Sequence, residues 1–263
     1  MTRHDWCVCT VVISFAPSDR VPLLLLGVRD EVTDRPWRPP ARHWLGSPLV
    51  GGIDEQAGGT WLAVHPGAAR VSCLLNGRGA AAAPAVRRSR GELPLRAAMD
   101  GPVALKDLAG DQSRLVAYDP FYLVCADTGS VLLLSWDGSA AACEELPPGT
   151  HMLTNAGHAY PADSAAEVTE PKAIRFAARF AAARPSGDPA APLAAAWGPW
   201  LPLAAGDGLP PDDPAAIVAR RSLPDGRQWG STSQTLVALG ADGLRYDFRP
   251  VPGAWYEVPI AGS

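Results

Sequence analysis

The sequence predicts an α+β protein built from two antiparallel sheets with helices on their outer faces. Two observations carry this prediction. Runs of β-branched and aliphatic residues come in pairs separated by turn residues, which is typical of antiparallel hairpins. Segments with helical spacing fall in two blocks between groups of strands, so strand and helix do not alternate as they do in a parallel sheet. The order along the chain is therefore strands, helices, strands, helices, strands.

The first group of strands opens with "CTVVISF" at 9–15. The turn "APSDR" joins it to a second apolar run that begins at Val21 and ends in the charged triplet Arg29-Asp30-Glu31. Because both runs are apolar without alternation, we expect a hairpin that is covered on both faces. Further along we expect irregular structure at 36–48, a glycine-rich turn and a strand at 60–64, and a strand from 70 that ends at the turn dipeptide Asn76-Gly77.

The second half of the chain is expected to show the same succession of groups of strands and groups of helices. A helix is expected from 89, strands at 121–127, 130–138 and 142–155, a helix within 165–183, a short helix near 193–204, and a closing hairpin with a short last strand at 231–260. In the helix within 165–183, Ile174, Phe176, Ala177 and Phe180 have helical spacing and are expected to face the core. Lys172, Arg175 and Arg179 are expected on its other faces.

Composition limits the class of protein. The 263 residues are 47% hydrophobic and 19% charged, with a net charge of −4, so a sizeable core is expected and a nucleic-acid partner is not. We expect one domain at 9–263 after an extension at 1–8. No signal peptide and no apolar run long enough to span a membrane is evident, and the five cysteines have no disulfide-framework spacing. These features predict a cytoplasmic protein and leave its oligomeric state open, while a small-molecule partner is expected only from the family resemblance of the sequence motifs.

Cysteine use raises one specific hypothesis. Cys73, Cys125 and Cys143 lie inside expected strands and are interpreted as core residues, and no second Cys/His pair accompanies Cys7 and Cys9 at zinc-ligand spacing. Val8 precedes Cys9, and the abundance of Ala, Gly, Arg and Pro indicates a GC-rich gene, in which the valine codon GTG also serves as a start codon. A product that begins Met-Cys-Thr would expose Cys9 as the first residue once Met is removed. Its α-amine would then act as the general base for its own thiol.

Several blocks together resemble a known family. They are Cys9-Thr10-Val11-Val12, "GVRDE" at 27–31, "GGIDEQAGGTWLAV" at 51–64, "LLNGRG" at 74–79, "SRGEL" at 89–93 and "LTNA" at 153–156. Their order and spacing are similar to those of the NRDE proteins, relatives of the transport and Golgi organisation 2 protein. The resemblance implies a four-layer αββα sandwich of the N-terminal-nucleophile (Ntn) hydrolase type.

The resemblance also implies site residues. Cys9 would be the nucleophile, Arg29 would stabilise its thiolate, and Asp30 would orient the α-amine. Asn76 and Asn155 would donate hydrogen bonds to an oxyanion. Each has a structural alternative, since an Arg-Asp-Glu triplet can be a solvated strand end and both asparagines can be turn residues.

Three features depart from the hydrolase expectation. Val28 replaces the asparagine after which the family is named, and Thr232 occupies the position of a family arginine, so the site has either lost a charge or recruits one elsewhere, with Arg78 as the candidate. An extension at 1–8, if retained, would leave Cys9 without a free amine. A hydrolase of this kind needs no cofactor. The alternative function is binding or trafficking of haem or another apolar metabolite, with His151 and His158 as candidate haem ligands or else as solvated loop residues.

Overall fold

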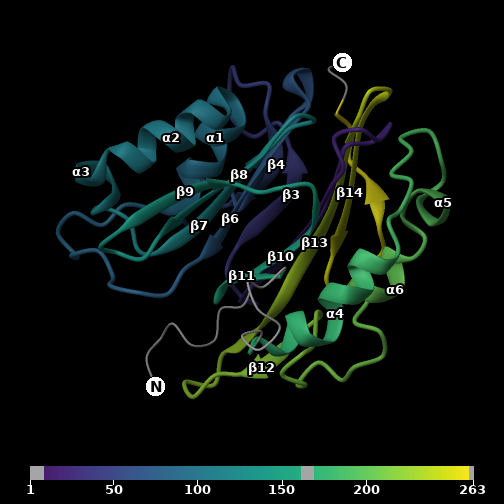
Figure 1. Cartoon of the computed structure of the whole chain (residues 1–263). Helices are drawn as coiled ribbons and strands as arrows, with labels where there is room; N and C mark the ends of the chain where they lie inside the picture. The colour runs from purple at the N-terminus through teal and green to yellow at the C-terminus, as the bar shows by residue number, and fades with distance from the viewer. Residues whose placement is uncertain (1–8, 161–168, 261–263) are drawn as a thin grey trace. The chain divides into compact units, whose positions relative to one another are not determined.

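The computed structural model describes residues 9–160 and 169–260, and it divides into two compact units (Figure 1). Unit 1 comprises Met1–Arg35 and Pro148–Glu257, and unit 2 comprises Pro36–Pro147 and Val258–Ser263. Each unit holds one antiparallel sheet with helices, which confirms the α+β class. The four-layer order and the single-domain assignment stay predictions, and the extension at 1–8 lies outside the described residues.

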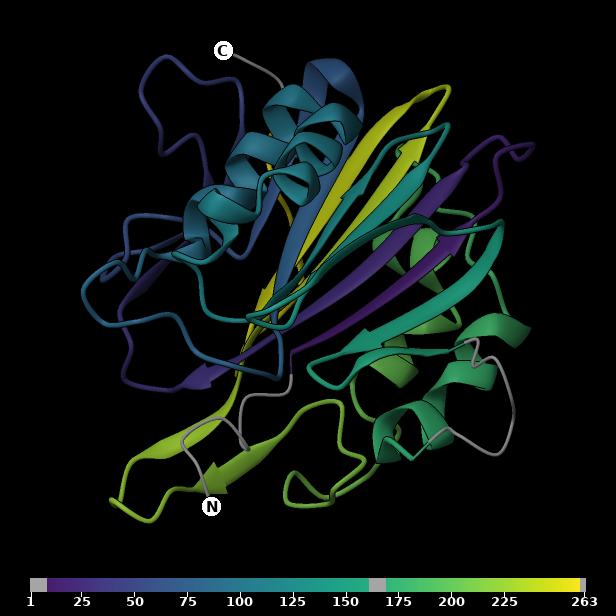
Figure 2. The ribbon, with the colours of Figure 1, turned by 60° about the vertical axis from the view of Figure 1, so that its left-hand side comes forward.

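Unit 1 is built on a sheet with the order β11-β10-β1-β2-β13-β14-β15, and β12 pairs with β13. Figure 2 shows the purple β1 and β2 between the teal-green β10 and the yellow-green β13. The expected first hairpin is therefore the centre of this sheet. Its strands are β1 (Thr10–Phe15), β2 (Leu23–Val32), β10 (Gly149–Thr154), β11 (Gly157–Tyr160), β12 (Arg220–Ser222), β13 (Gln228–Gly240), β14 (Gly243–Pro250) and β15 (Tyr256–Glu257).

Three helices cover one face of this sheet, namely α4 (Pro171–Ala182), α5 (Leu193–Trp197) and α6 (Trp200–Ala204). Val12 of β1 and Leu24, Leu26 and Val28 of β2 pack there. Because side chains alternate along a strand, Thr10 and Asp30 belong to this helix-covered face, whereas Cys9 and Arg29 belong to the opposite one.

Two side chains of α4 lie differently from the expectation. Ile174 is 64% exposed and Lys172 only 2% exposed, so the expected inward and outward roles of these two are reversed. The buried stripe is Ala173, Phe176, Ala177 and Phe180, to which Lys172 is adjacent. Lys172 is buried because an ion pair with Asp30 compensates its charge, which a periodicity of apolar residues cannot indicate.

Unit 2 has a sheet with the order β3-β4-β5-β6-β7-β8-β9, covered by α1, α2 and α3. Its strands are β3 (Trp37–Ala41), β4 (Val50–Asp54), β5 (Leu62–His65), β6 (Arg70–Asn76), β7 (Phe121–Ala126), β8 (Val131–Trp136) and β9 (Ala141–Glu145). Its helices are α1 (Leu93–Asp100), α2 (Pro102–Gly110) and α3 (Gln112–Leu115), with short 3₁₀ turns at Pro66–Ala68 and Arg90–Glu92.

Two strands of unit 2 correct the sequence-based expectation. The segment 36–48 is not wholly irregular, because β3 forms there despite Pro39 and Pro40; it is an edge strand with a register shift, where proline is tolerated. The glycine-rich segment after Val50 is a strand and not only a turn. A Cβ on Gly52 would lie 2.3 Å from the ring of Trp61, so this glycine lets the indole pack flat on β4.

The two most specific sequence blocks, "GGTWL" and "SRGEL", meet in unit 2. The amide of Thr60 donates to the carbonyl of Gly91 over 2.9 Å, and a Cβ on Gly59 would lie 2.4 Å from the backbone of Gly91. Only glycine allows two backbones to approach this closely. These blocks therefore serve the fold of unit 2.

Candidate active site

Cys9 immediately precedes β1, between the end of β10 and the second half of β2. Thr10 pairs with Thr154 of β10 on one side and with Val28 of β2 on the other. Cys9 immediately precedes the last of these pairs, so continuing the register would place it next to Asn155, the first residue of the turn after β10, and next to Arg29 of β2. Residues directly opposite each other in an antiparallel pair share a face and have Cβ atoms about 5 Å apart. The register therefore leads us to expect that three of the five predicted site residues, Cys9, Arg29 and Asn155, lie close together.

The thiol of Cys9 is half-buried and donates a hydrogen bond to the backbone carbonyl of Asp30 over 3.7 Å. Cys9 is therefore not sealed in the interior, unlike Cys73 and Cys125, which are buried as expected. Cys143 is only half-buried, because β9 is the edge strand of its sheet. Burial raises the pKa of the Cys125 thiol to about 12, so it stays protonated at neutral pH.

Arg29 is held by Thr232, the residue at which the family resemblance led us to expect an arginine. The register between β2 and β13 shifts between Ser231 and Ser233, so Thr232 is an extra residue in a β-bulge. Its hydroxyl accepts a hydrogen bond from the Arg29 guanidinium over 2.9 Å and donates one to the Arg29 carbonyl over 3.2 Å. The guanidinium also lies 3.8 Å from Glu31. Arg29 is thus buried and oriented, and it is not a solvated strand end.

Asp30 belongs to a buried network on the helix-covered face of the sheet. Its carboxylate accepts from the Ser231 hydroxyl at 2.5 Å and forms an ion pair with Lys172 at 3.2 Å. The Lys172 ammonium also donates to the hydroxyl of Thr10, the neighbour of Cys9, over 3.4 Å. Burial raises the pKa of Asp30, while Lys172 and the Ser231 hydroxyl act in the opposite direction. The network ties α4, β1, β2 and β13 together beside the thiol.

Sequence reasoning missed Lys172 and Ser231. Lys172 is 142 positions from Asp30 in the chain, and Ser231 is 201 positions away. Nothing local indicates such partners. The one available signal was a lysine within the first turn of a strongly amphipathic helix, next to its apolar stripe.

The two predicted oxyanion donors are in different units. Asn155 follows β10 in unit 1 and is 5% exposed, and its side-chain oxygen has no hydrogen-bond partner among the described residues. Asn76 is the last residue of β6 in unit 2, where it pairs with Phe121. Arg78, the predicted replacement cation, is exposed in unit 2. The roles of Asn76 and Arg78 stay predictions.

The two candidate haem ligands contact each other. Nδ1 of His151 lies 3.0 Å from Nε2 of His158, with His151 fully buried and His158 half-buried. Haem ligation by either stays a prediction. No group of three His, Cys, Asp or Glu side chains suited to a metal ion occurs within 9–160 and 169–260.

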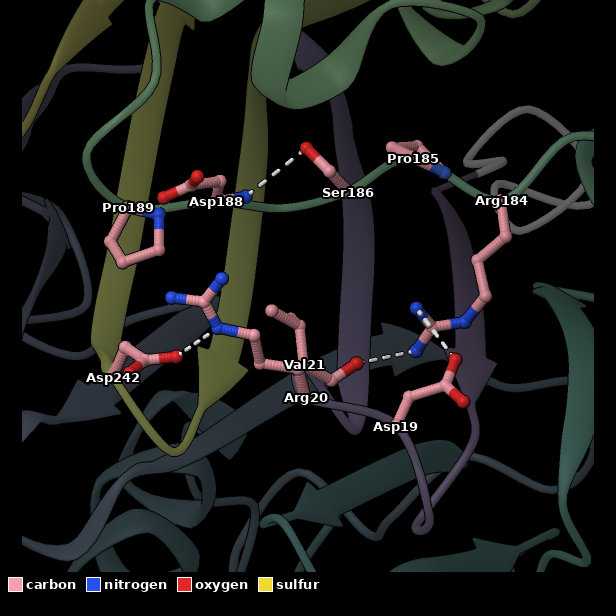
Figure 3. A pocket seen from close by; sticks show the side chains of 9 residues that line it. All are labelled: Asp19, Arg20, Val21, Arg184, Pro185, Ser186, Asp188, Pro189 and Asp242. Carbon is pink, nitrogen blue, oxygen red and sulfur yellow. Dashed lines mark hydrogen bonds and ion pairs between the residues drawn. The ribbon is translucent and has the colours of Figure 1, made fainter.

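A pocket of about 380 Å³ lies at the other end of the unit 1 sheet, by the turn that joins β1 to β2 (Figure 3). Both of its guanidinium groups are paired: Arg20 with Asp242, and Arg184 with Asp19 and the carbonyl of Val21. β1 separates this pocket from Cys9 by its full length of about 20 Å. It has no part in the chemistry of the thiol.

Helices in the described part of the chain are short. The longest is α4 with 12 residues, and none has the length and apolarity needed to cross a membrane.

Comparisons with known proteins place the chain in a family. No curated protein matches it in sequence. One similar solved structure is a Caenorhabditis elegans N-acylethanolamine-hydrolyzing acid amidase ortholog, at 12% identity and a TM-score of 0.46 over 95% of this chain and 100% of that one. A likeness of this size supports no argument about the site. The model of the Transport and Golgi organisation 2 family matches residues 8–184, which include Cys9, Arg29, Asp30, Asn155 and Lys172. The chain belongs to the Transport and Golgi organisation 2 family.

Proposed function

We propose that this protein is an N-terminal-cysteine amidohydrolase or acyltransferase of the Ntn type that acts on a small amide. The observation that carries the proposal is the position of Cys9, half-buried just before a central strand whose register sets the buried Arg29 on one side and the buried Asn155 on the other. A thiol, a cation and an amide donor on one face are the groups that acyl transfer requires.

The reaction assigns one role to each group. With residues 1–8 absent, the α-amine of Cys9 takes the proton of its thiol, and the sulfur attacks the carbonyl carbon. Arg29 stabilises the thiolate, and the side-chain amide of Asn155 donates to the oxyanion that develops on the carbonyl oxygen. The C–N bond then breaks, the α-amine returns the proton to the leaving amine, and water or another acceptor takes the acyl group from the thioester.

Asp30 has a different role from the one expected from sequence. Its carboxylate is engaged by Lys172 and Ser231, while its backbone carbonyl accepts from the thiol. We assign Asp30 to positioning of the strand end that Cys9 contacts. The ion pair with Lys172 also keeps a bare negative charge away from the thiolate, which such a charge would destabilise.

The test compares two forms of the protein. One is expressed as Met-Cys9-Thr10 onward, so that removal of Met exposes Cys9, and the other retains residues 1–8. Each is incubated with a set of N-acyl-7-amino-4-methylcoumarin amides of increasing acyl length. We expect hydrolysis by the trimmed form, none by its Cys9→Ala variant, and at least ~10²-fold less by the form that keeps 1–8, because it lacks the general base. Equal rates for the trimmed form and Cys9→Ala on every amide would refute the proposal.

A further inference from the structure

The pocket beside the turn between β1 and β2 carries more acidic than basic side chains. All of its lining residues belong to unit 1, and they include three aspartates and two arginines, so its walls hold one surplus negative charge. Its volume of about 380 Å³ lies within the range of small-molecule sites, roughly 300–1,000 Å³. The proposed reaction of Cys9 makes no use of this pocket.

The surplus charge belongs to Asp188. Arg20 forms an ion pair with Asp242, and Arg184 lies 3.5 Å from Asp19. Asp188 is the third carboxylate, and within the described ranges it forms no ion pair. The pKa of Arg20 is raised first by Asp242 and last by Asp188, which agrees with a longer distance between Arg20 and Asp188.

Hydrogen-bond acceptors are in excess in this pocket. One carboxylate oxygen of Asp188 accepts from the amide of Ala190 over 2.9 Å, and the other has no partner among residues 9–160 and 169–260. Asp242 likewise engages only one of its two oxygens in this part of the chain. The spare N–H groups of Arg20 belong to a side chain that is 73% exposed, so solvent can satisfy them. The pocket therefore suits a ligand that brings its own donors.

The wall that carries Asp188 is held in place by the protein itself. It is the segment 184–189, which Figure 3 shows along one side of the pocket, opposite the turn between β1 and β2. Arg184 donates to the carbonyl of Val21 over 2.7 Å. Arg245, which is 3% exposed, donates to the carbonyl of Asp188 over 3.2 Å, while a carboxylate of its own strand compensates its charge. A wall that is already ordered loses little conformational entropy when a ligand binds.

The arrangement of the charges favours an organic cation over a metal ion. No group of three His, Cys, Asp or Glu side chains suited to a metal ion occurs in the described part of the chain, so the three aspartates do not converge on one point. Val21, Pro185 and Pro189 add apolar surface to the same pocket. An ammonium group on a short hydrocarbon chain matches both the acidic and the apolar lining.

We infer that this pocket binds a small primary alkylammonium ion. The ammonium donates to the free carboxylate oxygens of Asp188 and Asp242, and the hydrocarbon part contacts Val21 and the two prolines. This binding site is separate from the proposed reaction, so it stands whether or not Cys9 is a nucleophile.

The test titrates the full chain with butylamine, tetramethylammonium and butyrate at low ionic strength and neutral pH. Backbone amides of Arg20, Val21 and Asp188 are followed by ¹H–¹⁵N NMR. Butylamine and tetramethylammonium have the same charge and similar size, but only butylamine carries N–H donors, and butyrate reverses the charge. We expect saturable shifts with butylamine, at least about fivefold weaker binding of tetramethylammonium, and no saturable shifts with butyrate. Cys9→Ala should bind butylamine as the wild type does.

Two variants of equal charge assign the binding to Asp188. Asp188→Asn should weaken butylamine binding by about fivefold, the size of an ion pair that is partly exposed to solvent, and it keeps an oxygen that can accept from the Ala190 amide. Asp212→Asn, which removes an exposed carboxylate of unit 1 outside the pocket, should leave the affinity unchanged. The inference would be overturned by non-saturable shifts with butylamine, by equal affinity for tetramethylammonium, by saturable binding of butyrate, or by the same loss in both variants.

Discussion

The buried ion pair between Lys172 and Asp30 allows a quantitative test of how the candidate site is held together. Their side chains are 3% and 0% exposed, and their charged groups are 3.2 Å apart. Removal of one partner from a buried pair costs about 3–5 kcal/mol, because the other charge is left uncompensated in the interior. We expect Lys172→Met to lower the free energy of unfolding by this amount near pH 8, and Asp30→Asn by a similar amount.

The cost of Lys172→Met should depend on pH, with a sign that follows from Asp30. Burial already raises the pKa of this carboxyl, and loss of the ammonium raises it further. Above the unfolded pKa of 3.8, the native variant binds a proton that the unfolded chain has released. Its stability is therefore full below about pH 4 and falls as pH rises toward the folded pKa, by about 1.4 kcal/mol per pH unit. Urea denaturation at pH 5 and pH 8 measures the difference.

Two variants make this test specific. Lys106, the other lysine of the sequence, is exposed on α2, so Lys106→Met should change stability by less than about 0.5 kcal/mol. The double variant Asp30→Asn/Lys172→Met carries no charge and should recover at least about 2 kcal/mol relative to the sum of the single changes. The reasoning would be refuted if Lys172→Met cost less than 1 kcal/mol at both pH values.

Two further predictions concern unit 2. Burial raises the pKa of the Cys125 thiol to about 12, so at pH 8 it should react with iodoacetamide about 10³-fold more slowly than an ordinary thiol. Peptide mapping before and after unfolding in urea measures the difference. Rapid labelling of Cys125 in the native protein would contradict its burial and its hydrogen bond to the Ala97 carbonyl. Gly59→Ala should lower the free energy of unfolding by about 1–3 kcal/mol, because the new methyl group overlaps the backbone of Gly91. The control Gly110→Ala places a methyl group where no atom lies within 4 Å, so it should leave stability unchanged. Thermal unfolding of both variants measures the difference.

The hairpin at the centre of the site was predictable because its information is local. Thr10–Phe15 and Leu23–Val32 are apolar runs joined by a short turn, and such runs pair whatever the rest of the chain does. The strand that ends before Asn155 was predicted less well, because the expected run at 142–155 is two strands, β9 in unit 2 and β10 in unit 1. Once Thr10 pairs with both neighbours, Cys9, Arg29 and Asn155 converge as a consequence of register alone.

The features that could not be predicted depend on contacts between residues that are far apart in the chain. Lys172 was expected outside because lysine is rarely buried without a partner, and its partner Asp30 is 142 positions away. The phase of α4 was misjudged for a related reason. Ile174 suggested one apolar stripe, whereas the alanine at 173 fits the tight contact with the sheet and leaves Ile174 in solvent. Small residues at close contacts carry little signal in a hydrophobic pattern.

The family match ends at residue 184, so the replacement of a family arginine by Thr232 stays a prediction, but the contacts that Thr232 makes can be compared with those of an arginine. A guanidinium at this position of the bulge would lie against that of Arg29, and two like charges would compete for Glu31. The threonine instead joins the Arg29 side chain to the Arg29 carbonyl through one hydroxyl, which fixes the remaining cation without adding a charge. Lys172 pairs with Asp30 on the helix-covered face, while the Arg29 guanidinium lies 3.8 Å from Glu31. A threonine at position 232 therefore fixes the Arg29 side chain through a single hydroxyl and adds no second guanidinium beside it.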